Sequence, residues 1–156
     1  MNFLRGVLGA AVLLLCGCGS PGTAAEVIED HVNDSGFSFF ECGAVTTDQC
    51  GMWTPTADDQ TVLDCLVAGF ATCQPARAEV TTPTIEGAPL VSTYFVVPDG
   101  KGGCDVDYFA DLADDPFAPP FELSLQRCSS LSLSSTCGWI SVWGCSVVES
   151  WDLVSP

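Results

Sequence analysis

The sequence predicts an α+β domain in which one helix, over about residues 57–73, packs on an antiparallel β meander stapled by disulfides. Three observations support this fold class. One segment has the apolar period of a helix, several later segments alternate with period two, and ten cysteines occur in 156 residues. Because 47% of the residues are apolar, the chain can bury a core, and we expect residues 37–156 to form a single domain.

The predicted helix has clear ends and one apolar face. Thr56 and Asp59 form a capping-box pattern directly after Pro55, and Pro75 follows the last turn. Its apolar positions recur at helical spacing: Val62, Leu63, Leu66, Val67 and Phe70, with Cys73 near the end. We therefore expect this face to pack on the sheet.

The predicted strands follow the helix. Residues 91–97 are rich in β-formers, residues 104–110 alternate in polarity, and residues 121–133 alternate almost throughout. The last run is the strongest pattern, with its large apolar residues on one face: Phe121, Leu123, Leu125, Leu131 and Leu133. Turn sequences at 86–89, 98–103 and 114–116 separate the runs, so we expect consecutive antiparallel hairpins.

The N-terminal residues have the order of an export signal. Arg5 supplies one positive charge, an apolar run covers Val7 to Leu15, and the small residue Gly17 precedes Cys18. The run is shorter than the roughly 20 residues that a membrane-spanning helix needs. Leu15-Cys16-Gly17-Cys18 resembles the lipobox of bacterial lipoproteins. This resemblance implies that residues 1–17 are a signal peptide, and that Cys18 becomes the N-terminus and carries diacylglycerol and a palmitate-type acyl chain.

Two alternatives compete with lipidation at Cys18. Modification of Cys16 would place the bulky Leu15 where lipoproteins carry a small residue. A general signal peptide cleaved near Ala24 or Ala25 would give a soluble secreted protein. Several acyl chains on one residue anchor a protein stably. Because Gly19 stands where an Asp would resemble an inner-membrane retention signal, we expect a lipid anchor in the outer membrane, facing the periplasm or the cell surface.

Residues 18–36 are small, polar and acidic, and we expect a lipidated flexible spacer there. The sole histidine, His31, falls within this segment, so we interpret it as a solvated linker residue rather than a catalytic or metal-binding one.

Outside the cytoplasm, an even number of cysteines predicts disulfides. Eight remain after Cys16 and Cys18, and we expect four bridges among Cys42, Cys50, Cys65, Cys73, Cys104, Cys128, Cys137 and Cys145. Cys65 and Cys73 cannot pair with each other, because eight helical residues rise about 12 Å and bridged Cα atoms lie within about 7 Å. Cys104 and Cys128 are equidistant from Pro116, so a hairpin turning there and containing a bulge would bring them together. A zinc site is the alternative, but the sequence has no Cys-x-x-Cys motif.

The charge excludes one class of partner. The formal net charge is -16, and removal of Arg5 with the signal peptide leaves three basic residues and a charge of -17. Nucleic-acid binding depends on Lys and Arg displacing counterions, so we expect no nucleic-acid partner.

Two features could bind a ligand. The acidic cluster Asp99, Asp105, Asp107, Asp111, Asp114 and Asp115 could supply oxygen ligands for Ca²⁺, but its spacing does not match an EF-hand, and we interpret it as a solvated strand face and turn. Trp139 and Trp143 would share one face of a strand, roughly 13 Å apart, and if exposed could form a platform for glycan. We favour the interpretation that both are core residues.

The sequence contains no recognisable catalytic motif. It lacks a Gly-x-Ser-x-Gly elbow and a P-loop, and its predicted domain has no histidine to act as a base. We expect no cofactor. We therefore expect a binding or structural module of the bacterial envelope, for glycan or protein, rather than an enzyme. The alternatives are an inhibitor or partner of another envelope protein and a carboxylate-dependent hydrolase.

Overall fold

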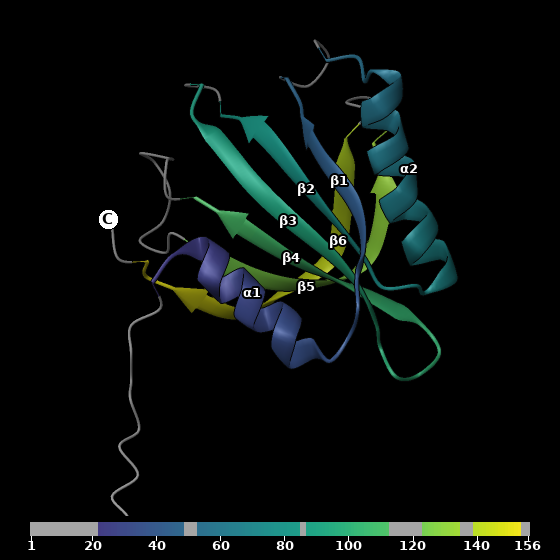
Figure 1. Ribbon diagram of the computed structural model, residues 1–156, viewed down its shortest axis with the longest axis vertical. Coiled ribbons are helices and arrows are strands. Elements are labelled where there is room, and N and C mark those ends of the chain that lie inside the picture. The colour runs from purple at the N-terminus through teal and green to yellow at the C-terminus, as the bar shows by residue number, and fades with distance from the viewer. Residues whose placement is uncertain (1–21, 49–52, 85–86, 113–122, 135–138, 154–156) are drawn as a thin grey trace, which may run out of the picture.

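The computed structural model describes residues 22–48, 53–84, 87–112, 123–134 and 139–153. These residues form one six-stranded sheet with two helices (Figure 1). The elements are α1 (Ala24–Ser35), β1 (Phe40–Thr46), α2 (Ala57–Thr72), β2 (Ala76–Pro83), β3 (Pro89–Pro98), β4 (Cys104–Asp111), β5 (Leu123–Leu133) and β6 (Ile140–Trp151). The α+β class predicted from the sequence is confirmed.

The strands lie in the sheet in the same order as in the chain, β1 to β6. From β2 to β6 every neighbouring pair is antiparallel, as expected for a meander. However, β1 and β2 are parallel, which corrects the prediction of a purely antiparallel sheet. Parallel neighbours need a long crossover connection, and α2 provides it.

Helix α2 matches its predicted range. Its N-cap Thr56 and Asp59 form the capping box, with Asp59 N–H donating to Thr56 Oγ1 at 3.2 Å. Leu63 and Leu66 are fully buried in the core on this side of the sheet. The helix ends at Cys73, whose φ of 53° is the left-handed conformation usual at helix C-termini.

Helix α1 corrects the prediction of a flexible spacer over residues 18–36, because residues 24–35 are helical and packed on the sheet. Thr23 and Glu26 form a second capping box, and Gly36 ends the helix with a φ of 70°. Val27 and Ile28 are buried, so this helix is part of the folded domain. The expectation of one helix was therefore wrong.

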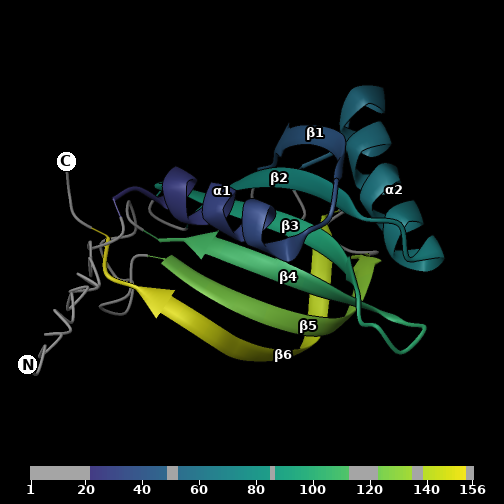
Figure 2. The ribbon, with the colours of Figure 1, turned by 60° about the horizontal axis from the view of Figure 1, so that its bottom comes forward.

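The two helices cover opposite faces of the sheet, as Figure 2 shows. Alternate residues of β3 and β4 contribute to different cores, with Val96 and Val106 on the α2 side and Phe95 and Phe109 on the α1 side. Strand β5 also contributes to both cores, but at its two ends. Leu123 and Leu125 pack with α1, whereas Leu131 packs with α2.

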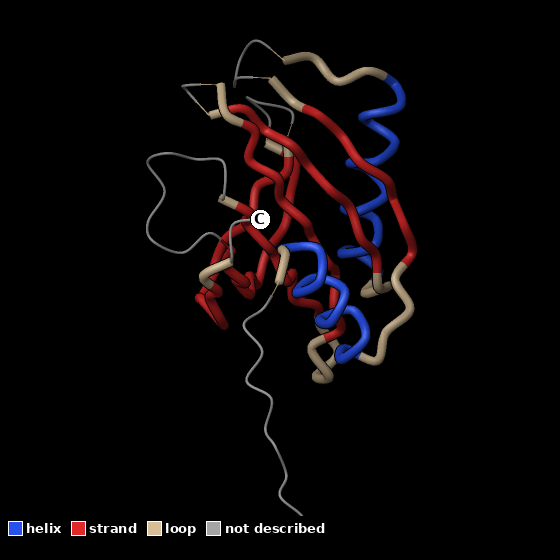
Figure 3. Tube along the Cα trace, turned by 60° about the vertical axis from the view of Figure 1, so that its left-hand side comes forward, coloured by secondary structure: helices blue, strands red, loops and turns tan. Residues whose placement is uncertain are grey.

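The predicted single apolar face of residues 121–133 is therefore wrong. The end of β5 that carries Leu131 lies beside α2 (Figure 2), away from the core that Leu123 occupies. Figure 3 shows the two helices, in blue, over separate parts of the sheet. Phe121 lies outside the described residues.

Three of the expected disulfides lie within the described residues. They are Cys42–Cys65, Cys73–Cys104 and Cys128–Cys145, while Cys50 and Cys137 lie outside the described residues. The pairing of Cys104 with Cys128 suggested by the sequence is wrong. Cys128 lies opposite Val106 of β4, and its disulfide partner is Cys145 on the neighbouring strand β6. Cys65 and Cys73 bond to different partners, as the helix geometry requires.

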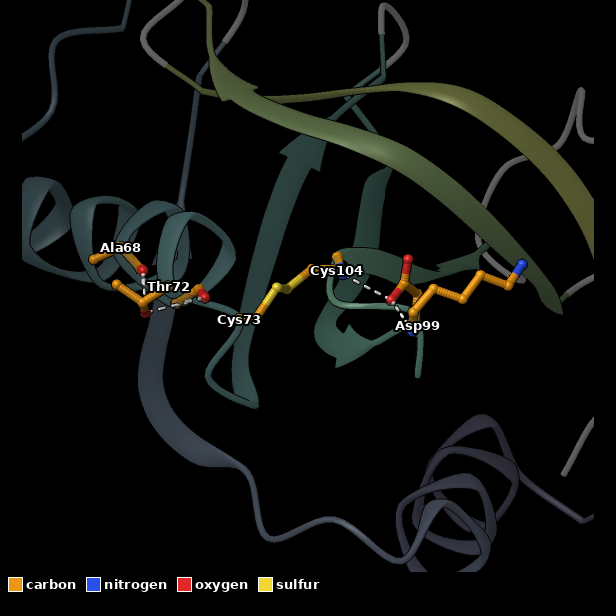
Figure 4. Close-up of a disulfide and its surroundings, with 8 residues drawn as sticks. Ala68, Thr72, Cys73, Asp99 and Cys104 are labelled. Carbon is orange, nitrogen blue, oxygen red and sulfur yellow. Dashed lines mark hydrogen bonds between the residues drawn. A yellow bond between two sulfur atoms is a disulfide. The ribbon is translucent and has the colours of Figure 1, made fainter.

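The bridges hold α2 at two positions. The first bridge joins Cys42 of β1 to Cys65 of α2. Cys42 forms a bulge that interrupts the register between β1 and β2, and Gly43 follows it with a φ of 114°. Figure 4 shows the second bridge, from Cys73 at the end of α2 to Cys104 at the start of β4. The crossover helix is therefore fixed covalently to two strands.

Candidate functional site

An ion pair between a buried carboxylate and a half-exposed guanidinium connects β4 and β5 under α1. Asp107 is 1% exposed and lies opposite Arg127 in the β4–β5 register. The guanidinium donates two hydrogen bonds to the carboxylate, from Nε to Oδ1 at 2.7 Å and from Nη2 to Oδ2 at 2.8 Å. This bidentate geometry is the strongest form of a protein ion pair. The interpretation of Asp107 as part of a solvated strand face was therefore wrong.

His31 of α1 joins this pair. Its Nε2 atom is buried and lies 3.2 Å from Asp107 Oδ2, although the approach is not aligned for a hydrogen bond. Its ring also lies against Phe95 and Phe109, with centroid distances of 5.6 and 5.0 Å. The interpretation of His31 as a solvated linker residue is corrected by these contacts, because the helix that carries it packs on the sheet.

Burial and pairing act in opposite directions on the carboxyl of Asp107. Burial raises the pKa of Asp107, but the hydrogen bonds and positive charge of Arg127, together with the nearby His31, outweigh burial and leave the pKa below its ordinary value. The same hydrogen bonds raise the pKa of Arg127. Because a general acid needs a raised pKa, Asp107 suits an ion pair that positions α1 better than it suits acid catalysis.

The acidic turn between β3 and β4 stabilises itself. Asp99 Oδ1 accepts hydrogen bonds from the backbone N–H groups of Lys101 and Gly103, at 2.7 and 2.8 Å. These bonds lower the pKa of Asp99. Within the described ranges, no group of three or more His, Cys, Asp or Glu residues is arranged to hold a metal ion. Asp114 and Asp115 lie outside those ranges.

Strand β6 is the last strand of the sheet, and one edge of its backbone has no neighbouring strand among the described residues. All eight residues from Trp143 to Ser150 are exposed. Three of them are large apolar side chains: Trp143, Val147 and Val148, which are 54%, 66% and 51% exposed. Glu149 is the only charged residue of the strand. The residues of β6 from Trp143 to Ser150 are called the open edge below.

The open edge lacks most of the features that protect sheet edges. Proteins usually guard such strands with Lys, Pro or a covering segment, or with a bulge. Here Ile140–Val147 keeps one register with β5 on both sides of Gly144, whose φ is 65°, and Val148 forms a bulge between Val147 and Glu149. In addition, the eight residues Ile140–Val147 include no charged residue and no proline.

A recess beside the open edge separates β6 from α1. It has a volume of about 350 Å³ and an apolar floor that includes Leu125 and Trp151. Three carboxylates line it, Asp30 and Asp34 from α1 and Glu149 from β6. Among the described residues, neither Arg77, Lys101 nor Arg127 forms an ion pair with these three, and His31 is the one basic residue that lines the recess. The lining of the recess therefore has more acidic than basic side chains.

The two tryptophans of the predicted glycan platform differ in their surroundings. Trp143 is exposed on β6, so the interpretation of both residues as core is wrong for Trp143. Trp139 lies just before β6 and is half-buried. A glycan platform needs both tryptophan rings open to solvent, and the ring of Trp139 is only partly exposed.

The predicted lipidation site, Cys18, lies outside the described residues. No helix in the described part of the chain is long and apolar enough to cross a membrane. No protein-family model, curated protein or solved structure matches this chain.

Sequence reasoning missed α1, the Asp107–Arg127 pair and the position of His31. Helix α1 could have been predicted from Thr23 and Glu26, which have the same capping-box spacing as Thr56 and Asp59 of α2. The recess forms only because α1 packs near β6, and no pattern within either segment predicts it.

Proposed function

We propose that this protein is a lipid-anchored binding module of the bacterial envelope, held in the outer membrane through Cys18, and that it binds another protein rather than a small substrate. The observation that supports protein binding is the open edge, where a strand with exposed apolar side chains ends the sheet. Apolar patches of this kind mark protein interaction sites.

The location outside the cytoplasm is supported by the disulfides. Three bridges join cysteines of four strands and α2, and such bonds persist in oxidising compartments. The lipobox-like sequence at residues 15–18 supports the anchor. Helix α1 begins at Ala24, so the folded domain would start a few residues from the lipid.

The open edge favours a protein partner over the two other functions considered. A glycan platform would need Trp139 as exposed as Trp143, and Trp139 is half-buried. A carboxylate-dependent hydrolase would need an acid with a raised pKa, and the most buried described carboxyl, Asp107, has a lowered one. A role as inhibitor of another envelope protein would use the same open edge.

Metabolic labelling tests the anchor. Cells producing the full chain are grown with an alkyne-labelled fatty acid, and label is measured on the purified protein. We expect label on the wild type and on Cys16→Ala, and none on Cys18→Ala, because only Cys18 would carry diacylglycerol. Cys16 is the matched control, two residues away in the same segment. Unlabelled wild-type protein, or label lost only in Cys16→Ala, would contradict the proposal.

A further inference from the structure

We propose that the open edge and the acidic recess beside it form one binding surface for an extended segment of a partner protein, and that this segment carries basic and apolar residues. The inference rests on the proposed function, because it assumes that the module binds a protein, and it names the surface and the chemistry of the partner.

The backbone of β6 supplies the first part of the surface. Its N–H and C=O groups on the outer side have no strand beside them in the described structure, and Ile140–Val147 keeps unbroken register with β5. An extended peptide can add to such an edge as a further strand, with main-chain hydrogen bonds giving affinity. The register supports a segment of about eight residues, up to the bulge at Val148.

The side chains of β6 supply the second part. Trp143 and Val147 lie on either side of Gly144, whose φ of 65° breaks the regular alternation of the strand, and both side chains are exposed. Aromatic and β-branched cross-strand pairs are among the most favourable in sheets. A partner strand with apolar side chains would contact both Trp143 and Val147.

The recess supplies the third part and gives the partner its charge. Glu149 lies two residues after Val147, and Asp30 and Asp34 reach the same recess from α1. Asp34 lies in the last turn of α1, where the negative end of the helix dipole disfavours a carboxylate. The helix therefore loses stability by carrying this charge, and a cation from a partner would compensate it.

The charge of the whole chain favours a basic partner over a second copy. The formal net charge is -16, so two copies repel each other, whereas a basic segment is attracted from a distance. Edge-to-edge pairing of two copies would also leave both recesses without a cation.

The binding test uses the mature, full-length protein in detergent micelles and two synthetic peptides. One peptide repeats Lys-Val four times and the other repeats Glu-Val four times, so the two share length and apolar content. Affinity is measured by the fluorescence anisotropy of labelled peptide, at two salt concentrations. We expect the Lys-Val peptide to bind at least tenfold more tightly, and its affinity to fall as salt rises.

Variants locate the bound peptide. Val147→Ser should weaken binding of the Lys-Val peptide about tenfold, and Phe40→Ser should leave it unchanged. Phe40 is a matched control, because it is 69% exposed on β1, at the opposite end of the sheet. Asp30→Asn with Asp34→Asn should weaken binding and reduce its salt dependence, whereas Asp58→Asn with Asp64→Asn on α2 removes the same charge elsewhere and should change little.

Four results would overturn the inference: equal affinity for the two peptides, no binding of either peptide, equal effects of the two pairs of Asp→Asn substitutions, or equal effects of Val147→Ser and Phe40→Ser. Sedimentation of the protein alone gives a fifth, because a dimer abolished by Val147→Ser would make a second copy the occupant. If the purified protein carries no lipid but binds the Lys-Val peptide, only the lipid anchor is contradicted. If it carries lipid but does not bind the Lys-Val peptide, only the inference about the binding surface is contradicted.

Discussion

Replacing Arg127 with methionine should destabilise the protein more than its position on the surface suggests. Arg127 is 47% exposed, but its partner Asp107 is 1% exposed and receives two hydrogen bonds from it. Methionine keeps an apolar stem of similar length and removes the charge. The variant therefore leaves a buried carboxylate without its main partner.

The expected loss can be estimated from this geometry. Removing one member of a fully buried ion pair costs about 3–5 kcal/mol. Because Arg127 is half exposed, screening by solvent reduces the expected loss to about 2–3 kcal/mol. For a chain of this length, that corresponds to a fall in Tm of roughly 5–10 °C.

The effect should depend on pH in a defined direction. In the wild type the pKa of Asp107 is lowered, so its contribution to stability is present above the unfolded-state value of about 3.9 and is lost as pH falls through the lower folded-state pKa. Without Arg127, burial raises the pKa of Asp107 instead. The carboxyl then protonates at a higher pH, and the difference in unfolding free energy between variant and wild type should shrink as pH falls from 7 to 4.

Urea unfolding of the oxidised protein at pH 7 and pH 4 measures this difference. Arg77→Met is the matched control, because Arg77 pairs with Glu29 and Glu41, which are 60% and 65% exposed, and should cost less than about 1 kcal/mol. Adding Asp107→Asn to Arg127→Met should recover part of the loss. Equal losses for the two arginines at pH 7, or a loss for Arg127→Met that grows toward pH 4, would refute the reasoning.

Three further perturbations test other parts of the structure. Ile28→Ala should lower the unfolding free energy by about 2–4 kcal/mol, because Ile28 is 9% exposed against the sheet, and an effect below about 0.5 kcal/mol would show that α1 does not pack there. Replacing both Cys73 and Cys104 with serine should cost about 3–4 kcal/mol from the 31-residue separation, measured by urea unfolding, and an unchanged midpoint would contradict the bridge. Asp34→Asn should raise the unfolding free energy by about 0.3–1 kcal/mol, and Asp58→Asn should lower it by a similar amount, because the two residues lie at opposite ends of their helices. Changes of the same sign in both variants would mean that net charge, rather than the helix dipole, sets the effect.

Local signals in the sequence predicted α2 well. Its capping box and apolar face depend only on residues within one segment, and the structure places its ends at Ala57 and Thr72. The same local signal was present for α1 at Thr23 and Glu26. It was overlooked because the acidic and small residues there are typical of a linker, and the packing of Val27 and Ile28 on the sheet outweighs that composition.

Features that depend on strand register could not be predicted in the same way. Asp107 and Arg127 face each other because β4 and β5 pair in one register, and a shift by one residue would separate them. The disulfides depend on topology, since Cys73 reaches Cys104 only because α2 crosses over the sheet and ends near β4. The alternation of residues 104–110 predicts a strand, but it does not reveal that α1 covers the face that carries Asp107.

The open edge shows the same limit. The sequence of β6 is apolar in the manner of a core strand, which favoured burial of Trp143. Burial also depends on which strands lie beside it, and β6 is the last strand in the sheet. Exposure of Trp143 therefore depends on what packs around β6 in the fold, and the residues of β6 do not reveal it.

Intact mass spectrometry of the mature protein, purified from its native membrane with and without reduction and alkylation, tests the proposal of a lipid-anchored extracytoplasmic module most directly. The account predicts that Cys18 is the N-terminal residue and carries acyl mass, and that no cysteine is alkylated before reduction. After reduction, the eight cysteines that follow Cys18 should all be alkylated. An N-terminus without acyl mass would contradict the anchor, and thiols that react before reduction would contradict a fully disulfide-bonded domain.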